Sequence, residues 1–423
     1  MLINKIKQQL SNQFIRNVGW MGGAELINRI FRLGTTITLA RLLSPYDYGL
    51  AAVVLTTNEI TTVFILGSGI GSKLIQTDEK DLKVLCDTAY WINWIVCGAL
   101  FIIQCIAAFP IAWFYGDNRV ILPICVVALV YLMMPLYAVQ VAMINRENRL
   151  NIIALCNLLQ SALGNTLTIG LAILGMGMWA IILPIVLTTP IWIVINLMNH
   201  PWRPTKSFTL DRWQEIASFG KNMLGSELLD KVRANLDYLL VGRFLGINAL
   251  GIYYFAFNAG LGISLNVINT LTWPLFPHLC AVRKDREQFK RRYFKSLKTI
   301  AIVIVPLIIL QSSLAPFYVP IVFGQKWITA IPILILICLS ALPRPFFNAA
   351  SQVLNAVDKT HINFYCNIGF TLIFTILLLF AMRWGVVGVA AAVLISHIAI
   401  MPIFTVWATR YVLGEKSSVL FAE

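Results

Sequence analysis

Residues 20–50 read W-M-G-G-A-E-L-I-N-R-I-F-R-L-G-T-T-I-T-L-A-R-L-L-S-P-Y-D-Y-G-L. The stretch is apolar and long enough to cross a bilayer, yet its first half carries Glu25, Asn28, Arg29 and Arg32. At about 100° per residue, these four side chains lie within about 100° of one another. The sequence therefore predicts a membrane-spanning helix with a single polar stripe.

The same stretch recurs about 200 residues later in the chain. Its copy, residues 222–255, matches at a constant offset of 202, since 227 − 25 and 243 − 41 give the same difference. The matches include Glu25/Glu227, Arg29/Lys231 and Arg41/Arg243. Later matches at offsets of 208 and 210 are Gly116/Gly324, Pro135/Pro343, Asn157/Asn367 and Gly175/Gly385. We interpret this as one duplicated unit, a pattern typical of transporters.

The composition excludes an ordinary soluble protein. The 423 residues are 58% hydrophobic and 12% charged, with a mean hydropathy of +0.77. Apolar blocks of about 20 residues are long enough to span hydrocarbon, and backbone groups in lipid must be satisfied within a helix. We predict an all-α polytopic membrane protein with about 12 transmembrane helices in two pseudo-symmetric six-helix lobes. The predicted spans are 18–42, 48–71, 88–112, 120–143, 152–174, 177–198, 218–242, 250–276, 298–321, 329–355, 361–382 and 385–409.

The domain organisation follows from these spans. Because each half contains an even number of spans, both halves enter the membrane from the same side and form parallel repeats. The predicted parts are an amphipathic interfacial segment 1–17, an N-terminal lobe 18–198, a cytoplasmic linker 199–217, a C-terminal lobe 218–411 and a cytoplasmic tail 412–423.

The net charge of +14 reflects orientation in the membrane and not nucleic-acid binding. Of the 33 Lys and Arg residues, 23 fall on the side of the N-terminus and 5 on the opposite side. The positive-inside rule therefore predicts that both termini are cytoplasmic, with anionic membrane lipids as partners. The basic segment 281–298 has Phe289, Tyr293, Phe294 and Leu297 at helical spacing. We predict that this segment lies on the membrane surface, with a solvated loop as the alternative.

Motifs of enzymes and metal sites are absent from the sequence. It contains no HExxH, Walker or GxSxG motif, and its four histidines are scattered. The prediction is a transporter that needs no cofactor or metal. Without an ATP-binding motif, active transport must draw on an ion gradient, such as protons or sodium ions, on the membrane potential or on a downstream pull.

Charges within the predicted spans are the candidate functional residues. Each costs roughly 2.5 to 3.5 kcal/mol at the centre of an inserting helix and therefore normally faces a protein interior or a wet cavity. In the seventh predicted span, Glu227 can pair with Lys231, and Asp237 with Arg233. In the first, Glu25 can pair with Arg29.

Two interpretations of these charges remain open. In the structural one, they form an interhelical network in which Arg32 reaches Asp230 or Asp237. In the functional one, the first and seventh spans line a shared cavity for an anionic substrate, since Arg binds phosphate with two hydrogen bonds. The candidate substrate-binding residues are Arg29, Arg32, Lys231, Arg233, Asn28 and Asn258. The candidates for ion coupling or a charge network are Glu25, Glu59, Glu227, Asp230 and Asp237.

Two motifs resemble those of a known family. Residues 40–49, A-R-L-L-S-P-Y-D-Y-G, resemble the signature "aRlLsPedfG" of the polysaccharide transporters. Residues 235–253 resemble the segment with which the second half of these proteins begins. These transporters belong to the multidrug/oligosaccharidyl-lipid/polysaccharide (MOP) exporter superfamily, which includes the multidrug (MATE) transporters.

The resemblance implies a flippase of the bacterial cytoplasmic (inner) membrane. Such a protein translocates polyprenyl-diphosphate-linked oligosaccharide units by alternating access, for exopolysaccharide, capsule or O-antigen synthesis. Its cavity is lined mainly by the first, second, seventh and eighth helices, and its candidate partners are the polysaccharide polymerase and glycosyltransferases. The alternatives are a cation-coupled multidrug exporter of the same superfamily and a non-transporting scaffold of a glycan-assembly complex.

Overall fold

The computed structural model describes residues 31–66, 70–205, 207–272, 274–283 and 285–414. These residues form helices and connecting turns, and no strand occurs among them. The predicted interfacial segment 1–17 and the charges Glu25, Asn28 and Arg29 lie outside the described residues. Contacts divide the chain into two compact units, residues 1–232 and 233–423. This division falls inside a helix, while the predicted domain boundaries at 198 and 217 stay a prediction.

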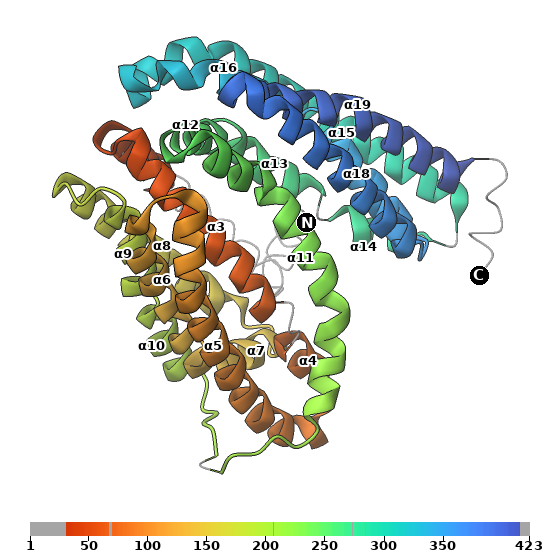
Figure 1. Ribbon diagram of the computed structural model, residues 1–423. Coiled ribbons are helices and arrows are strands. Elements are labelled where there is room, and N and C mark those ends of the chain that lie inside the picture. Colours follow the sequence, from red (N-terminus) through yellow and green to blue (C-terminus); the bar gives the residue numbers. More distant parts are fainter. Residues whose placement is uncertain (1–30, 67–69, 206, 273, 284, 415–423) are drawn as a thin grey trace, which may run out of the picture. The chain divides into compact units, whose positions relative to one another are not determined.

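Unit 1 begins, in its described part, with helical residues 31–42. Its further elements are α3 (Pro45–Leu66), α4 (Ile70–Gln76), α5 (Glu79–Tyr115), η1 (Asn118–Val120), α6 (Ile121–Met133), α7 (Pro135–Arg146), α8 (Leu150–Ile173), α9 (Trp179–Thr188), α10 (Pro190–Asn199) and the first part of α11 (Trp213–Leu245). Within the unit, α5 packs on α6, α8 on α9, and α4 on α7 (Figure 1).

Unit 2 contains the end of α11 and the elements that follow it. They are α12 (Ile247–Ala259), α13 (Leu261–Thr272), α14 (Leu275–Cys280), α15 (Arg286–Tyr318), η2 (Val319–Phe323), η3 (Gln325–Ala330), α16 (Ile331–Leu339), α17 (Arg344–Ala356), α18 (Thr360–Ala381), η4 (Met382–Trp384) and α19 (Gly385–Leu413). Here α19 packs on α16, α17 and α18 (Figure 1).

The described part of each predicted span falls on one helix or on two or three consecutive helices. The described residues contain 7 helices that are long and apolar enough to cross a membrane, or 8 if the pair α6 and α7, bent by 53°, is one span. This bend occurs at Pro135, where a helix hydrogen bond cannot form. The all-α membrane fold is therefore confirmed, and the number 12 is consistent with it but stays a prediction.

The backbone confirms the internal duplication. Gly116 and Gly324 have φ of 72° and 105°, and Gly175 and Gly385 have φ of 75° and 67°. Both pairs occupy the positions matched in the sequence. A further pair, at the offset 358 − 148 = 210, is Asn148 and Asp358, with φ of 55° and 59°. Asn and Asp tolerate this left-handed conformation better than most side chains. The two units therefore repeat the same unusual turns.

The growth of the offset also has a structural cause. Helices α5 and α15 begin at an offset of 207, since 286 − 79 = 207, and Gln104 and Gln311 keep it. Among the described residues, the π-helical turn η2 occurs in unit 2 alone, and its wider turn accommodates one more residue. Beyond it, Gly116 and Gly324 lie at 208. The longer η3 adds two residues, because α6 and α16 begin at 121 and 331. At this offset of 210, Pro135 corresponds to Pro345 and not to Pro343.

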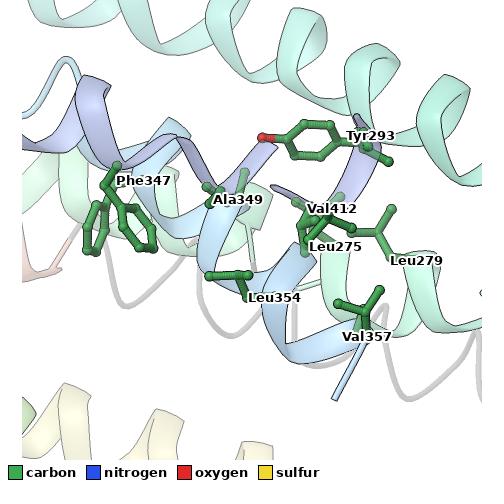
Figure 2. Packing of buried hydrophobic residues seen from close by; sticks show 14 of the residues in the cluster. Leu275, Leu279, Tyr293, Phe347, Ala349, Leu354, Val357 and Val412 are labelled. Carbon is green, nitrogen blue, oxygen red and sulfur yellow. The ribbon is translucent and has the colours of Figure 1, made fainter. Parts of the chain in front are cut away.

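The core of unit 2 corrects the predicted surface segment 281–298. Residues 286–298 are the first part of the continuous helix α15. Phe289 and Tyr293 are fully buried in a cluster with Leu275, Leu279 and Val412 (Figure 2). Two of the aromatic residues of the predicted surface segment, Phe289 and Tyr293, therefore pack inside the protein, while Phe294 is exposed. Tyr293 also hydrogen-bonds Thr409 of α19 at 3.0 Å.

The linker between the halves is bound to unit 1. The hydroxyl of Thr88 in α5 donates to the carbonyl of Asp211 at 2.8 Å, and the indole of Trp91 donates to that of Ser207 at 3.0 Å.

An ion-pair network secures the end of the linker. Arg212 contacts Asp81 at 2.8 Å and Glu215 at 2.5 Å, and Glu215 contacts Lys73 at 3.3 Å. The hydrogen bond from Arg212 holds the pKa of Glu215 below its ordinary value. The start of α11 is thus attached to α4 and α5.

We predict opposite effects of two alanine substitutions in one helix and its cap. Gly116→Ala forces a side chain into φ 72° and should destabilise the protein by about 1 to 2 kcal/mol. Gly98→Ala lies inside α5 with no atom within 4 Å of the added Cβ and should stabilise it by up to about 1 kcal/mol. Thermal unfolding of the purified variants, followed by Trp fluorescence, measures both. Equal midpoints for the two variants would contradict the assigned turn.

Candidate substrate site and charge networks

Lys231, one of the predicted substrate-binding residues, forms an accessible ion pair in unit 1. Lys231 of α11 places its Nζ 3.4 Å from Oε2 of Glu59 in α3. The two side chains are 44% and 53% exposed, so water can reach both charges. Arg32, in the helical residues 31–42, is exposed as well. An exposed pair contributes little to stability, so these charges remain available to a ligand.

Arg233, a second predicted substrate-binding residue of α11, hydrogen-bonds the first of a series of Asn side chains in unit 2. Arg233 donates from Nη1 to Oδ1 of Asn367 in α18, and its guanidinium lies 5.9 Å from the ring centre of Phe370. The amide of Asn367 donates to the side chain of Asn363 at 3.2 Å, and Asn363 donates to Asn355 at 3.3 Å. A half-buried Arg is thus held at the head of a row of polar side chains.

Asp237 has a different partner from the one predicted. The Tyr253 hydroxyl donates to its carboxylate at 2.7 Å, and the backbone N–H of Tyr238 donates at 3.0 Å. No ion pair between Asp237 and Arg233 occurs among the described residues, and the nearby charge is that of Arg344 in α17. Asp237 is only 5% exposed. Burial with two hydrogen bonds indicates a structural role for this carboxylate.

Further buried polar residues were not among the predicted site residues. His397 of α19 stacks beside Phe370 and Phe374, with all three ring centroids 5.8 Å from one another. In unit 1, Tyr131 donates to Asn58 at 2.8 Å and contacts Gln104 at 3.1 Å. Gln104 and Gln311 are matched in the two units, so their repeat offset was a signal in the sequence.

The remaining predicted residues are less informative. Asn258 is half-buried, and its amide donates to the carbonyl of Tyr254 one turn earlier at 2.9 Å. Glu227 is half-buried and Asp230 is exposed on α11. No cluster of metal-ligating side chains occurs within the described ranges. The structure therefore groups Lys231 with Glu59 and Arg233 with Asn367, and it gives Asp237 a separate network.

The class of protein follows from a family model. Residues 38–332 match the family described as polysaccharide biosynthesis protein, and the chain belongs to this family. The match includes α3 to α15 and both motifs that resemble the family, at residues 40–49 and 235–253.

Curated relatives carry more specific names. The chain is 26% identical to the teichuronic acid biosynthesis protein TuaB of Bacillus subtilis, over 85% of this chain and 75% of that protein. It is 25% identical to the lipopolysaccharide biosynthesis protein WzxC of Escherichia coli, over 92% and 79%. It is 23% identical to the succinoglycan biosynthesis transport protein ExoT of Rhizobium meliloti, over 77% and 65%.

Solved structures confirm the predicted MOP-type fold. The lipid II flippase MurJ in its inward closed conformation superimposes with a TM-score of 0.76 at 15% identity, over 92% of this chain and 87% of that one. An inward-facing MATE multidrug transporter of the MOP superfamily gives a TM-score of 0.72 at 15% identity, over 93% and 95%. At this identity the likeness defines the fold alone.

We predict that Tyr253→Phe destabilises unit 2. It removes the hydroxyl donor of the buried Asp237 carboxylate and should lower the free energy of unfolding by about 1 to 3 kcal/mol. The matched control, Tyr365→Phe, changes a side chain on α18 that is 69% exposed and should have little effect. Chemical unfolding of both variants in detergent measures the difference. A Tyr253→Phe variant as stable as the control would show that the hydroxyl does not stabilise Asp237.

Proposed function

We propose that this protein is a flippase for polyprenyl-diphosphate-linked oligosaccharides, used in exopolysaccharide, capsule or O-antigen synthesis. The observation that carries the proposal is an accessible ion pair between Lys231 and Glu59, which lies in the candidate membrane span Pro45–Gln76, in a chain of the polysaccharide biosynthesis family. Such a charge is costly in hydrocarbon and is retained where it faces water or an anion. A diphosphate bears two or more negative charges and suits a site with several basic groups.

The pair of Lys231 and Glu59 suggests how binding and release could be coupled. At 3.4 Å and about half exposed, the pair is weak. An arriving diphosphate outcompetes one carboxylate for Lys231, because it brings more charge and more acceptor oxygens. Glu59 is then left without this partner and takes up a proton or a sodium ion. Loss of that ion restores the Lys231 pair and favours release of the diphosphate.

Among the predicted coupling residues, Glu59 fits this role better than Asp237. Asp237 accepts hydrogen bonds from the Tyr253 hydroxyl and the Tyr238 N–H and is nearly inaccessible to solvent. Ion exchange at Asp237 would require these buried hydrogen bonds to break in each transport cycle. Arg233 differs again, since Asn367 fixes its guanidinium in position. We propose that Arg233 and Arg32 contribute substrate contacts and that Glu59 exchanges the ion.

The location and partners are part of the same proposal. We propose transport and not catalysis as the activity, in the bacterial cytoplasmic membrane with both termini in the cytoplasm. The excess of Lys and Arg on one side supports this orientation. A polymerase on the opposite face and glycosyltransferases on the cytoplasmic face would consume and supply the substrate.

A second candidate function is supported by the MATE fold alone. An exporter of cationic drugs needs acidic and aromatic groups along its path. The basic residues Arg32, Lys231 and Arg233 oppose that chemistry, so we rank it second.

Deletion of the gene followed by mass spectrometry of prenyl-linked oligosaccharides tests the proposal. A complete lipid-linked unit should accumulate on the cytoplasmic face and be cleared by the wild-type gene. Lys231→Gln and Arg233→Gln should each slow clearance by roughly 10- to 100-fold, the effect of losing one charge-assisted hydrogen bond. Glu59→Gln should slow it and remove its dependence on pH or on sodium.

The control is Lys80→Gln, which neutralises an exposed lysine at the start of α5. It should clear the intermediate at the wild-type rate, and all variants should be present in the membrane in equal amounts. Normal export in every variant would favour the scaffold. Unchanged lipid-linked intermediates with altered drug sensitivity would favour the exporter.

A further inference from the structure

The first third of α15 presents a strongly basic surface. Its members, which we call the basic face of α15, are Lys290, Arg291, Phe294, Lys295 and Lys298. All five side chains are exposed, and at about 100° per residue they lie within about 140° of one another. Phe294, with 47% of its surface exposed, lies in the middle of the four charges.

The orientation of this face is fixed by the core. Phe289 and Tyr293, on the other side of the same turns, are fully buried against α14 and α19. None of the four basic side chains forms an ion pair with another described residue. The helix therefore holds four basic side chains and one aromatic ring away from its own core, and one exposed acidic side chain, Glu287, lies on the same face.

The equivalent surface in unit 1 is covered by a polypeptide segment. At the offset of 207, Lys295 and Lys298 correspond to Thr88 and Trp91 of α5. Those two side chains donate to carbonyl groups of the non-helical linker, at Asp211 and Ser207. The ring of Trp91 also contacts Phe208 of the linker, with centroids 5.3 Å apart in an edge-to-face arrangement.

The two surfaces share a pattern of donors but differ in charge. In unit 1, neutral donors bind neutral carbonyl groups beside an aromatic pair. In unit 2, the donors at the same positions are ammonium groups, which bind carboxylates more strongly than carbonyls. We propose that the basic face of α15 is a docking site for an acidic, aromatic-containing segment of a cytoplasmic partner protein, bound in an extended conformation.

The length of the helix argues against the membrane surface as the occupant. Helix α15 and η2 together contain 38 residues and extend about 57 Å, while hydrocarbon is about 30 Å thick. Lys290 lies eight residues before Lys298, or about 12 Å along the axis. The headgroup layer beyond the hydrocarbon is only about 5 to 8 Å deep. With the hydrocarbon beginning at Lys298, as the predicted span 298–321 has it, Lys290 and Arg291 extend past this layer.

A peptide-binding experiment tests the proposal. The probe is a fluorescent 12-residue peptide of Glu and Ser with one central Phe, added to the full chain in nanodiscs of neutral phosphatidylcholine. Lys290→Gln with Lys295→Gln should weaken binding by on the order of tenfold, the sum of a few surface ion pairs. Phe294→Ser should weaken it as well, and a peptide with Gln in place of Glu should not bind.

The matched control is Lys80→Gln with Lys83→Gln, which removes two exposed charges from the equivalent helix α5. It should leave binding unchanged, and equal weakening in both double variants would overturn the proposal. Loss of peptide binding in nanodiscs of phosphatidylglycerol would instead identify anionic lipid as the occupant. A tenfold gain in binding after removal of residues 415–423 would identify this segment of the chain as the occupant of the basic face. Either of these results would overturn the proposal that a partner protein binds there.

Discussion

A charged side chain inside a bilayer must find a partner, because leaving it alone costs several kcal/mol. This chain carries such charges in candidate spans of both of its units, Glu59 in unit 1 and Arg344 in unit 2, and the charges around them are satisfied in two ways. In unit 2, Asp237 is buried and accepts hydrogen bonds from the Tyr253 hydroxyl and the Tyr238 N–H. In unit 1, Lys231 and Glu59 satisfy each other while both stay accessible. The first arrangement holds helices together, and the second leaves a charge that a ligand can take.

Much of the fold could be predicted because membrane spans are encoded locally. A block of about 20 apolar residues can only be a helix in hydrocarbon, so the described part of every predicted span is mainly helical. The duplication was also readable, since turns that need φ above zero retain Gly, Asn or Asp at fixed offsets. Pro135 marks the break between α6 and α7 for a similar local reason.

The partners of the charged residues could not be predicted in the same way. Spacing along one helix favoured a pair of Asp237 and Arg233, four residues apart. Tertiary packing instead brings the Tyr253 hydroxyl to Asp237 and Asn367, more than 100 residues away, to Arg233. The prediction that segment 281–298 lies on the membrane surface was wrong for a related reason. Its aromatic residues have the spacing of a lipid-binding helix, but the same spacing also suits a core, and Phe289 and Tyr293 contact α14 and α19.

The duplication also explains why the two units need not do the same work. Once two copies share a fold, one can keep a structural contact while the other loses it without unfolding. The linker occupies the outer face of α5 through Thr88 and Trp91, and the corresponding positions of α15 are Lys295 and Lys298. Lysine at these positions gains nothing from packing within unit 2, since both side chains are exposed. Exposed charge beside the ring of Phe294 is therefore better explained by a molecule outside the fold than by the fold itself.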